Sequence, residues 1–186
     1  LAVMELARGS LSLAAVCTMQ SLMGTWFLYR FGDEEVKEYF REALKGNKIG
    51  GICMTEPDAG SDLMAIKTMA RVKEDGFVLN GQKTWVTSAP VADFFTVLAR
   101  TDNHDQLSIF FVPKNLPGVM VGKSIEKMGV RGSLTSEVAF NDVKLPRNYL
   151  LGAIGEGTRC LREILAEIRI MTGALAIGVA EAAFHD

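Results

Sequence analysis

The spacing of apolar residues divides the 186-residue chain into a helical start, a strand-rich middle and a helical end. Residues 1–29 are rich in Leu, Ala, Met and Ser and contain no Pro, which predicts one or two packed helices. A further helix is expected after Asp33, which is a suitable N-cap followed by two Glu residues. It should run toward Lys45 and end before Gly46-Asn47.

From Ile49 the pattern changes to short β-branched and aromatic runs separated by turn residues. Glu74-Asp75-Gly76 and Asn80-Gly81 predict tight turns between the first of these runs. Runs this short, about ten residues apart, are typical of a compact antiparallel sandwich or barrel. The predicted strands are Ala70–Val72, Phe77–Asn80, Lys83–Thr87, Phe94–Ala99, Leu107–Val112, Val119–Gly122 and Glu137–Val143.

Pro146 closes the strand-rich region, and Gly152, Gly155 and Gly157 lead into a second helical region. Apolar residues recur there at helical spacing, which predicts one helix with a wide apolar stripe. The fold class is therefore α+β, with a β-domain flanked by parts of two helical regions. The stripe comprises Leu161, Ile164, Leu165, Ile168, Met171, Leu175 and Val179.

Composition argues against several function classes. The 20 Lys and Arg residues nearly balance 22 Asp and Glu residues, so the chain lacks the basic footprint of a nucleic-acid-binding protein. Cys17, Cys53 and Cys160 are far apart and form no motif with histidine, so neither a disulfide framework nor a metal site is expected. No apolar run approaches the roughly 18 residues that span a bilayer, so membrane insertion is not expected. Glu56 and Asp58 have no partner base near in sequence, which leaves them without a catalytic role.

The first segment with candidate chemistry is Gly50–Asp62. A strand should end at Thr55, and Pro57 stiffens the turn that follows. Gly60 and Ser61 then allow a ligand to approach the backbone closely, and consecutive N–H groups in such a turn can bind an anion. A phosphate or cofactor contact is one interpretation, and a plain Pro-Gly turn is the other.

The second candidate segment is Leu79–Ser88. Strand alternation after the predicted Asn80-Gly81 turn puts Trp85 and Thr87 on one face. A flat aromatic ring beside a hydroxyl suits a planar ligand, through stacking and one hydrogen bond. Trp85 as an ordinary core residue is an equally good interpretation of the pattern.

Further motifs follow these two segments along the chain: Pro117-Gly118-Val119, Lys127-Met-Gly-Val-Arg-Gly-Ser133, Val138-Ala-Phe-Asn-Asp-Val143, Leu150-Leu-Gly152 and Arg169. With Thr55-Glu-Pro-Asp-Ala-Gly-Ser-Asp62 and Leu79-Asn-Gly-Gln-Lys-Thr-Trp-Val-Thr87, they resemble the acyl-CoA dehydrogenase family in order and spacing. The resemblance implies the end of an N-terminal helical domain (1–48), a middle β-domain (49–152) and the first helix of a C-terminal helical domain (153–186). Both ends of the chain interrupt helical patterns, so we expect part of a longer protein.

The implied activity is FAD-dependent α,β-dehydrogenation of an acyl-CoA thioester to the trans-2-enoyl thioester, with electrons passed to an electron-transfer flavoprotein. The family is also expected to form a homotetramer, in the cytoplasm or the mitochondrial matrix. The resemblance assigns FAD contacts to Ile52, Met54, Thr55, Gly60, Ser61, Trp85 and Thr87. Gly60 and Ser61 would contact the pyrophosphate, Thr55 the pyrimidine edge, Thr87 the flavin N5, and Trp85 the ring where electrons leave. Substrate contacts fall to Ser61, near the pantetheine arm, and to Arg169, at the nucleotide end of CoA.

Some positions depart from the family's pattern. Leu165-Ala166 stands where many members have a Phe-Asp pair near Arg169, which weakens the expected recognition of CoA. Ser88-Ala89 stands where the family usually has Asn-Gly after the Trp-x-Thr strand. Some members carry the catalytic Glu just before this arginine, where Ile168 stands, and Glu167 is rotated about 100° away around the helix. The catalytic base is therefore expected outside this chain, and no catalytic residue is assigned. A non-catalytic binding or assembly module, and a flavin oxidase or monooxygenase of the same fold, remain as alternatives.

Overall fold

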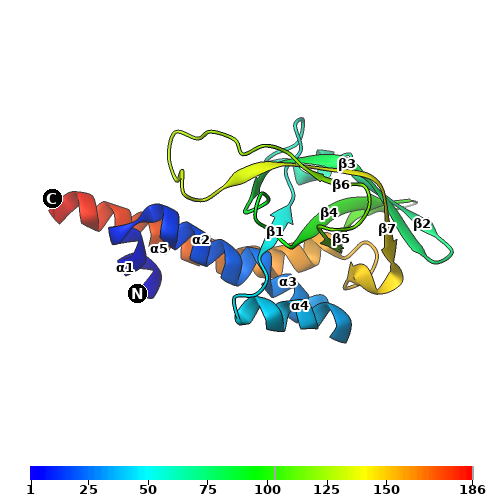
Figure 1. The fold of residues 1–186 in the computed structure, drawn as a ribbon, viewed down its shortest axis with the longest axis horizontal. Helices are drawn as coiled ribbons and strands as arrows, with labels where there is room; N and C mark the ends of the chain where they lie inside the picture. Colours follow the sequence, from blue (N-terminus) through cyan, green and yellow to red (C-terminus); the bar gives the residue numbers. More distant parts are fainter. Residues whose placement is uncertain (103, 186) are drawn as a thin grey trace.

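The computed structural model describes residues 1–102 and 104–185. A curled β-sheet lies against a layer of helices that extends beyond it at one end (Figure 1). The α+β fold class predicted from the sequence is confirmed. The domain boundaries at 48/49 and 152/153 stay predictions, although the elements change from helix to strand and back near these positions.

The N-terminal region is helical, as predicted, and short polar residues set where its helices begin. Ser10 caps α2 by accepting a hydrogen bond from the Leu13 N–H, and Asp33 caps α4 by accepting one from Val36 at 2.9 Å. Gly46 follows α4 with a φ of 81°, a conformation that favours glycine. The elements are α1 (Ala2–Gly9), α2 (Leu11–Thr18), the π-helix η1 (Met19–Gly24), α3 (Trp26–Phe31) and α4 (Glu34–Leu44).

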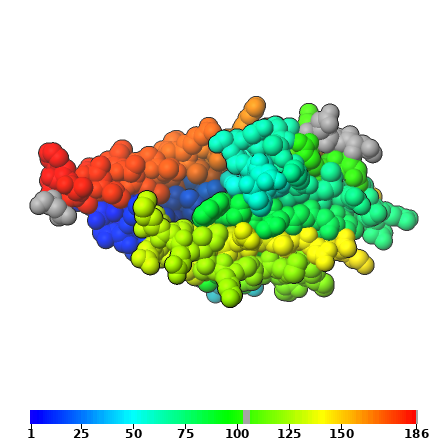
Figure 2. Space-filling model, turned by 90° about the horizontal axis from the view of Figure 1, so that it is seen from above, coloured from blue at the N-terminus to red at the C-terminus, as the bar shows by residue number. Residues whose placement is uncertain are grey.

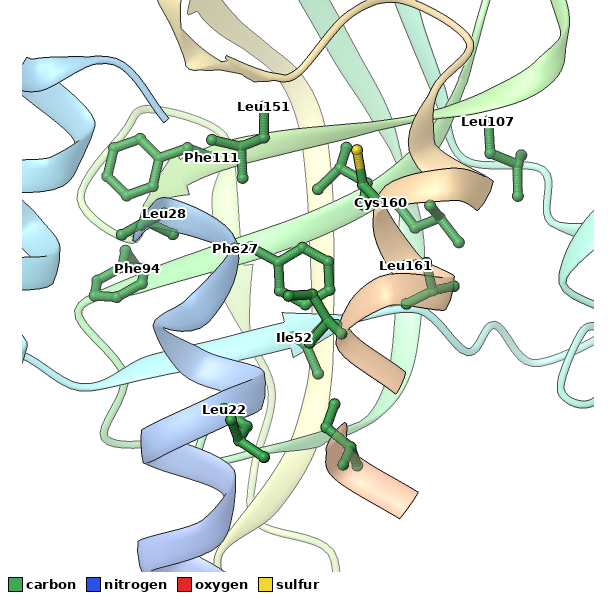
Figure 3. Packing of buried hydrophobic residues seen from close by; sticks show 14 of the residues in the cluster. Leu22, Phe27, Leu28, Ile52, Phe94, Leu107, Phe111, Leu151, Cys160 and Leu161 are labelled. Carbon is green, nitrogen blue, oxygen red and sulfur yellow. The ribbon is translucent and has the colours of Figure 1, made fainter. Parts of the chain in front are cut away.

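The stretch Leu11–Phe31 is helical for most of its length and, by length and composition only, is long and apolar enough to cross a membrane. The expectation that no apolar run approaches that length was therefore wrong. The core helix of a folded protein passes the same test, and Leu22, Phe27 and Leu28 are buried against the sheet and α5 (Gly157–His185) in Figure 3. Length and composition are thus weak evidence for a membrane span here.

The sheet has eight strands in the order β6-β7-β3-β2-β4-β5-β8, with β1 paired to β4 beside this path. It is an open, mixed sheet rather than a closed antiparallel barrel, because β1 and β2 both run parallel to β4. The sheet curls over itself, so that the rings of Phe77 on β3 and Phe110 on β5 lie 5.0 Å apart although two strands separate them in the sheet. The strands are β1 (Gly50–Cys53), β2 (Met69–Lys73), β3 (Gly76–Thr87), β4 (Phe94–Thr101), β5 (His104–Pro113), β6 (Val119–Val121), β7 (Thr135–Pro146) and β8 (Leu150–Leu151).

Strand β4 lies between two hydrophobic clusters, and its residues alternate between them. Phe94 and Leu98 face the helical layer, where they pack with residues of α3 and α5. Phe95 and Val97 face the inside of the curl, where they pack with residues of β3, β5 and β7. Because both faces of β4 are buried, this strand and its neighbours form a fixed base for the segments attached to its edge.

The turn predicted at Glu74-Asp75-Gly76 is confirmed between β2 and β3, but the one predicted at Asn80-Gly81 is wrong. Strand β3 continues through this pair, with a register shift against β7 between Leu79 and Gly81. Gly81 has a φ of 150°, and a Cβ placed on it would lie 2.4 Å from Oγ1 of Thr68. The glycine therefore permits a close approach between two segments, rather than a reversal of the chain.

The C-terminal helix α5 buries Leu161, Ile164, Ile168 and Leu175 of its predicted stripe and leaves Leu165 and Met171 partly buried. Beyond Leu175, Gly178 replaces Val179 on the buried side, because α1 crosses so closely that a Cβ on Gly178 would lie 2.3 Å from the Met4 carbonyl. Val179 is consequently partly exposed, which corrects that position of the stripe.

The region that connects β6 to β7 lies beside α1 and α2 (Figure 2), where the Gly132 N–H donates to the Ser12 hydroxyl. The remaining elements are the 3₁₀ helices η2 (Leu63–Ala65) and η3 (Arg147–Tyr149).

Candidate functional site

The segment Met54–Thr68, called the 54–68 loop below, leaves and rejoins the same edge of one strand. Strand β1 ends with Cys53 opposite Val97 of β4, and β2 begins with Met69 opposite Arg100 of β4. Both strands run parallel to β4, so the two ends of the loop are anchored only three positions apart on β4 (97 to 100). The sheet therefore fixes the base of a loop that carries Thr55, Gly60 and Ser61.

Strand β3 brings the second predicted segment against this loop. The Thr84 N–H donates a 2.9 Å hydrogen bond to the Thr55 carbonyl, although β1 and β3 are not paired as strands. A little further along, a Cβ on Gly51 would lie 3.1 Å from the Thr87 carbonyl. The two candidate segments, about thirty residues apart in the chain, thus form one continuous surface.

A β-bulge presents Trp85 at this surface. Trp85 has a φ of 57°, and the pairing of β3 with β7 shifts register between Lys83 and Val86. Its side chain is 57% exposed, so the interpretation of Trp85 as an ordinary core residue is wrong. Thr87 is half-buried. A left-handed conformation is costly for a bulky residue and is concentrated at functional sites, which makes this exposed ring a candidate ligand contact.

Below the surface lies a buried ion pair that the sequence did not reveal. The Lys83 side chain is fully buried, and its ammonium donates to the Met54 carbonyl at 3.0 Å and to Oε1 of Glu56 at 2.9 Å. Glu56 is 6% exposed and also accepts from the N–H groups of Lys67, at 2.6 Å, and Thr68, at 2.9 Å. Lys83 continues the inward series of Phe77, Leu79 and Gly81 by steps of two, and this alternation was the available signal for a buried lysine.

The environment of the pair sets the charge state of each partner. Burial lowers the pKa of Lys83, and the hydrogen bond and charge of Glu56 oppose that effect. Burial alone would raise the pKa of Glu56, but hydrogen bonds from Thr68, the Lys67 backbone and Lys83 outweigh it and hold the pKa below its usual range. Glu56 is therefore an anion whose two oxygens accept hydrogen bonds from Lys67, Thr68 and Lys83.

The outer part of the 54–68 loop is exposed and locally ordered. Glu56 and Ala59 exchange two backbone hydrogen bonds around the predicted Pro57 turn. Asp62 caps η2 by accepting a hydrogen bond from the Met64 N–H at 3.0 Å. Gly60 and Ser61 are exposed between these features, and a Cβ on Gly60 would meet no atom within 4 Å. A ligand can therefore reach the backbone here without displacing a side chain.

A family model described as "Acyl-CoA dehydrogenase, middle domain" matches residues 51–143, which include the whole of this surface. The chain belongs to the acyl-CoA dehydrogenase family.

Individual relatives agree with this assignment. The chain is 55% identical over 185 residues to benzylmalonyl-CoA dehydrogenase of Aromatoleum aromaticum, covering 98% of this chain and 49% of that protein. Among solved structures, a glutaryl-CoA dehydrogenase from Mycobacterium smegmatis in complex with FADH2 superposes with a TM-score of 0.91 at 34% identity, covering 99% of this chain and 47% of the other. A structure described as the electron transferring flavoprotein of Acidaminococcus fermentans has a chain that matches with a TM-score of 0.91 at 37% identity, covering 98% and 49%. The chain spans about half the length of the relatives that it matches.

Residues assigned by resemblance to the acyl-CoA dehydrogenase family lie at different depths. Ile52 is 9% exposed and belongs to the cluster on the helix side of the sheet, while Met54 and Thr55 are half-buried at the start of the loop. Ile52 thus supports the surface from below. Any contact of Ile52 with a ligand stays a prediction, as do the contacts assigned to Met54, Thr55, Gly60, Ser61, Trp85 and Thr87.

Arg169, the other predicted substrate contact, lies on α5. Its side chain and that of Glu167 are exposed, whereas Ile168 between them is buried in the core. In the described part of the chain, residues 1–102 and 104–185, no hydrogen bond or ion pair joins Arg169 to the 54–68 loop. The structure therefore brings together the loop and the end of β3, and among its described residues no hydrogen bond or ion pair joins Arg169 to either of them.

A hollow of about 600 Å³ lies at the turn between β2 and β3, away from this surface. Lys73, Phe77 and Lys144 are among its lining residues, and none of the predicted site residues lines it. The candidate site is thus an open surface built on the sheet edge rather than this hollow.

Proposed function

We propose that the protein binds FAD across the 54–68 loop and the end of β3, and that it removes hydrogen from the α and β carbons of an acyl-CoA thioester. The observation that carries this proposal is the hydrogen bond from the Thr84 N–H to the Thr55 carbonyl, which makes one surface of the two segments that resemble the family's flavin motifs. Relatives that act as acyl-CoA dehydrogenases support the reaction type.

The residues of this surface fit FAD. Trp85 presents a flat aromatic side chain that is 57% exposed, and Thr87 has a hydroxyl two residues away. The exposed backbone at Gly60 and Ser61 offers close approach for a pyrophosphate, because no atom of the residues that the structure describes lies within 4 Å of a Cβ on Gly60. A planar ring would thus find partners at the end of β3, and a charged tail would find them at the exposed backbone of the 54–68 loop.

Each predicted site residue has a separate role in this proposal. When bound, FAD would supply the acceptor for the hydrogen that leaves the β carbon. Thr55 and Thr87 would hold the flavin ring by hydrogen bonds, and Trp85 would pack beside it. Ser61 would contact the pantetheine arm, and Arg169 would bind the nucleotide end of CoA through charge-assisted hydrogen bonds. No residue of this chain is assigned as the base that removes the α proton.

The benzylmalonyl-CoA dehydrogenase relative makes benzylmalonyl-CoA the first substrate to test, because its 55% identity is well above the 34% and 37% of the two solved structures. The proposal also includes transfer of electrons to an electron-transfer flavoprotein, supported by the exposed Trp85 at the predicted exit from the ring. A homotetramer stays part of the proposal as an expectation from family resemblance.

Anaerobic reduction of the purified whole protein tests this function. We expect flavin absorbance in the protein as isolated or after reconstitution with FAD, and loss of that absorbance when benzylmalonyl-CoA is added without oxygen. Glutaryl-CoA serves as a second thioester with a different acyl group. A colourless protein that takes up no FAD would favour a non-catalytic module. A flavoprotein that no acyl-CoA reduces would favour an oxidase or monooxygenase of the same fold.

A further inference from the structure

We infer that the buried Lys83–Glu56 ion pair is a positioning device that holds the cofactor-binding surface in register, an inference that rests on the proposed function. The pair connects the outgoing end of the 54–68 loop, the returning end of that loop, and the part of β3 that leads to Trp85 and Thr87. Proposed FAD contacts lie on the outgoing end at Thr55, between the two ends at Gly60 and Ser61, and on β3.

Lys83 makes the connection between β3 and the outgoing end of the 54–68 loop. Its side chain leaves β3 two residues before Trp85, and its ammonium donates to the Met54 carbonyl at 3.0 Å. The next residue, Thr84, donates its N–H to the Thr55 carbonyl. Two successive residues of β3 thus donate to two successive carbonyls of the loop. These two hydrogen bonds fix the position of Thr55 relative to Trp85.

Glu56 extends the connection to the far end of the loop. Oε1 accepts from Lys83, at 2.9 Å, and from the Thr68 N–H, at 2.9 Å, while Oε2 accepts from the Lys67 N–H at 2.6 Å. One carboxylate therefore joins the outgoing and returning ends of the loop, eleven and twelve residues apart. Gly60 and Ser61 lie between these ends, so their position depends on the closure that Glu56 makes.

The neighbouring packing leaves little room for another arrangement. Thr68 lies against Gly81, where a Cβ would come within 2.4 Å of the Thr68 Oγ1. Arg100 of β4 donates to the carbonyls of Met64 and Ile66 on the returning end. Burial of an ion pair is costly and by itself is weak evidence of stabilisation, so geometric specificity is the better explanation for keeping two charges here.

Two variants of the whole protein test this role. Glu56→Gln keeps the size of the side chain, but its amide nitrogen cannot accept from a backbone N–H. Lys83→Met keeps an unbranched side chain, one heavy atom shorter, and removes the ammonium. Without flavin, we expect the amides of Lys67 and Thr68 to exchange hydrogen about tenfold faster or more in both variants. With flavin, we expect the FAD dissociation constant to rise about tenfold or more and the absorbance maxima of the bound flavin to shift.

Two controls separate positioning from general stability. Val112→Ala removes buried volume from β5, away from the loop, and should lower the melting temperature without changing the flavin spectrum or FAD affinity. Asp58→Asn removes the exposed partner of Lys67 in the same loop and should change none of these measurements.

The outcomes are distinct. If the Lys83 and Glu56 variants only lower the melting temperature, as Val112→Ala does, with FAD affinity and spectrum unchanged, the inference is wrong. If neither variant folds, the pair is required for folding rather than for positioning, and the inference is also overturned. If only Glu56→Gln folds, the inference is tested on that variant: weaker FAD binding with shifted absorbance maxima supports it, and unchanged values overturn it. If the wild-type protein binds no FAD while the Lys67 and Thr68 amides still exchange faster in the variants, the proposed function fails and the holding of the loop stands.

Discussion

The inner and outer parts of the 54–68 loop each contribute a carboxylate to an ion pair of nearly the same length, in opposite surroundings. Lys83 and Glu56 are 2.9 Å apart, with side chains 0% and 6% exposed. Lys67 and Asp58 are 3.0 Å apart, with side chains 75% and 74% exposed. Water screens the outer pair and leaves its partners free to move, whereas the inner pair has exchanged water for fixed hydrogen bonds. The distance between the charged groups alone does not show which pair holds the loop in place. Burial and shared partners indicate that the inner part is fixed and that the outer part is available to a ligand.

The largest expected difference between the two parts is in folding stability. Lys83→Met leaves the Glu56 carboxylate buried without its counter-ion, which should lower the free energy of unfolding by about 3–5 kcal/mol. Asp58→Asn should leave the unfolding midpoint unchanged within error. Urea denaturation of both variants beside the wild type measures the contrast. Equal midpoints for the two variants would show that burial of the inner pair has no energetic consequence.

The two glycines of the site should respond in opposite ways to a methyl group. Gly81→Ala forces a strained φ of 150° and a clash with Thr68, so we expect a loss of about 1–3 kcal/mol of stability. Gly60→Ala meets no atom within 4 Å and should change stability by less than about 0.5 kcal/mol, while weakening FAD binding. Thermal unfolding and FAD titration are the two measurements. Loss of stability in Gly60→Ala would mean that the outer loop is more tightly packed than the structure shows.

A smaller effect is expected at Thr87, which lies at the edge of the surface. Thr87→Ala should slow reduction of FAD-saturated enzyme by about two- to twelvefold, the equivalent of one neutral hydrogen bond of roughly 0.5–1.5 kcal/mol. FAD binding should change less, because the anchoring is shared with Thr55, Gly60 and Ser61. Stopped-flow reduction of wild type and variant gives the comparison. An unchanged rate with a lowered melting temperature would leave Thr87 as an ordinary strand residue.

The smallest expected effect is a change in the response to acid. The folded pKa of Glu56 lies below its ordinary value of 4.5, so its contribution to stability is fully present above that value and is lost as the pH falls through the folded pKa. Glu56→Gln should therefore lose less stability than the wild type between about pH 5 and pH 3. Denaturation midpoints across this range measure the slope, and identical slopes would contradict the lowered pKa of Glu56.

Local signals in the sequence predicted most elements, because caps and turns depend on nearby residues. Asp33 caps α4 and Gly76 closes the β2–β3 turn, as expected from single positions. The turn predicted from Asn80-Gly81 was wrong because Gly81 allows close packing against Thr68, a contact that nearby residues in the sequence do not reveal. Lys83 was missed for a similar reason, since a lysine in a strand is ordinarily exposed and only the packing of Glu56 beneath the loop explains its burial.

For the site residues too, the sequence predicted the motifs, and the fold was needed to show how they meet. The motifs Thr55–Asp62 and Leu79–Thr87 were identified from their order in the chain, but their contact through Thr84 and Thr55 required the fold. The bulge at Trp85 decided between a core residue and an exposed one, which alternation alone left open. The parallel pairing of both β1 and β2 with β4 has no local signature, although it determines where the loop is anchored.

Tryptophan fluorescence during FAD titration tests the location of the cofactor most directly, because this chain contains two tryptophans in different places. Trp85 is exposed on the proposed flavin surface, whereas Trp26 stacks on Tyr29 in the helical layer at a ring distance of 4.9 Å. We predict that added FAD quenches the emission of the wild type and of Trp26→Phe, and that Trp85→Phe loses this quenching while still binding FAD. Quenching that persists undiminished in Trp85→Phe would place the flavin elsewhere and contradict the account.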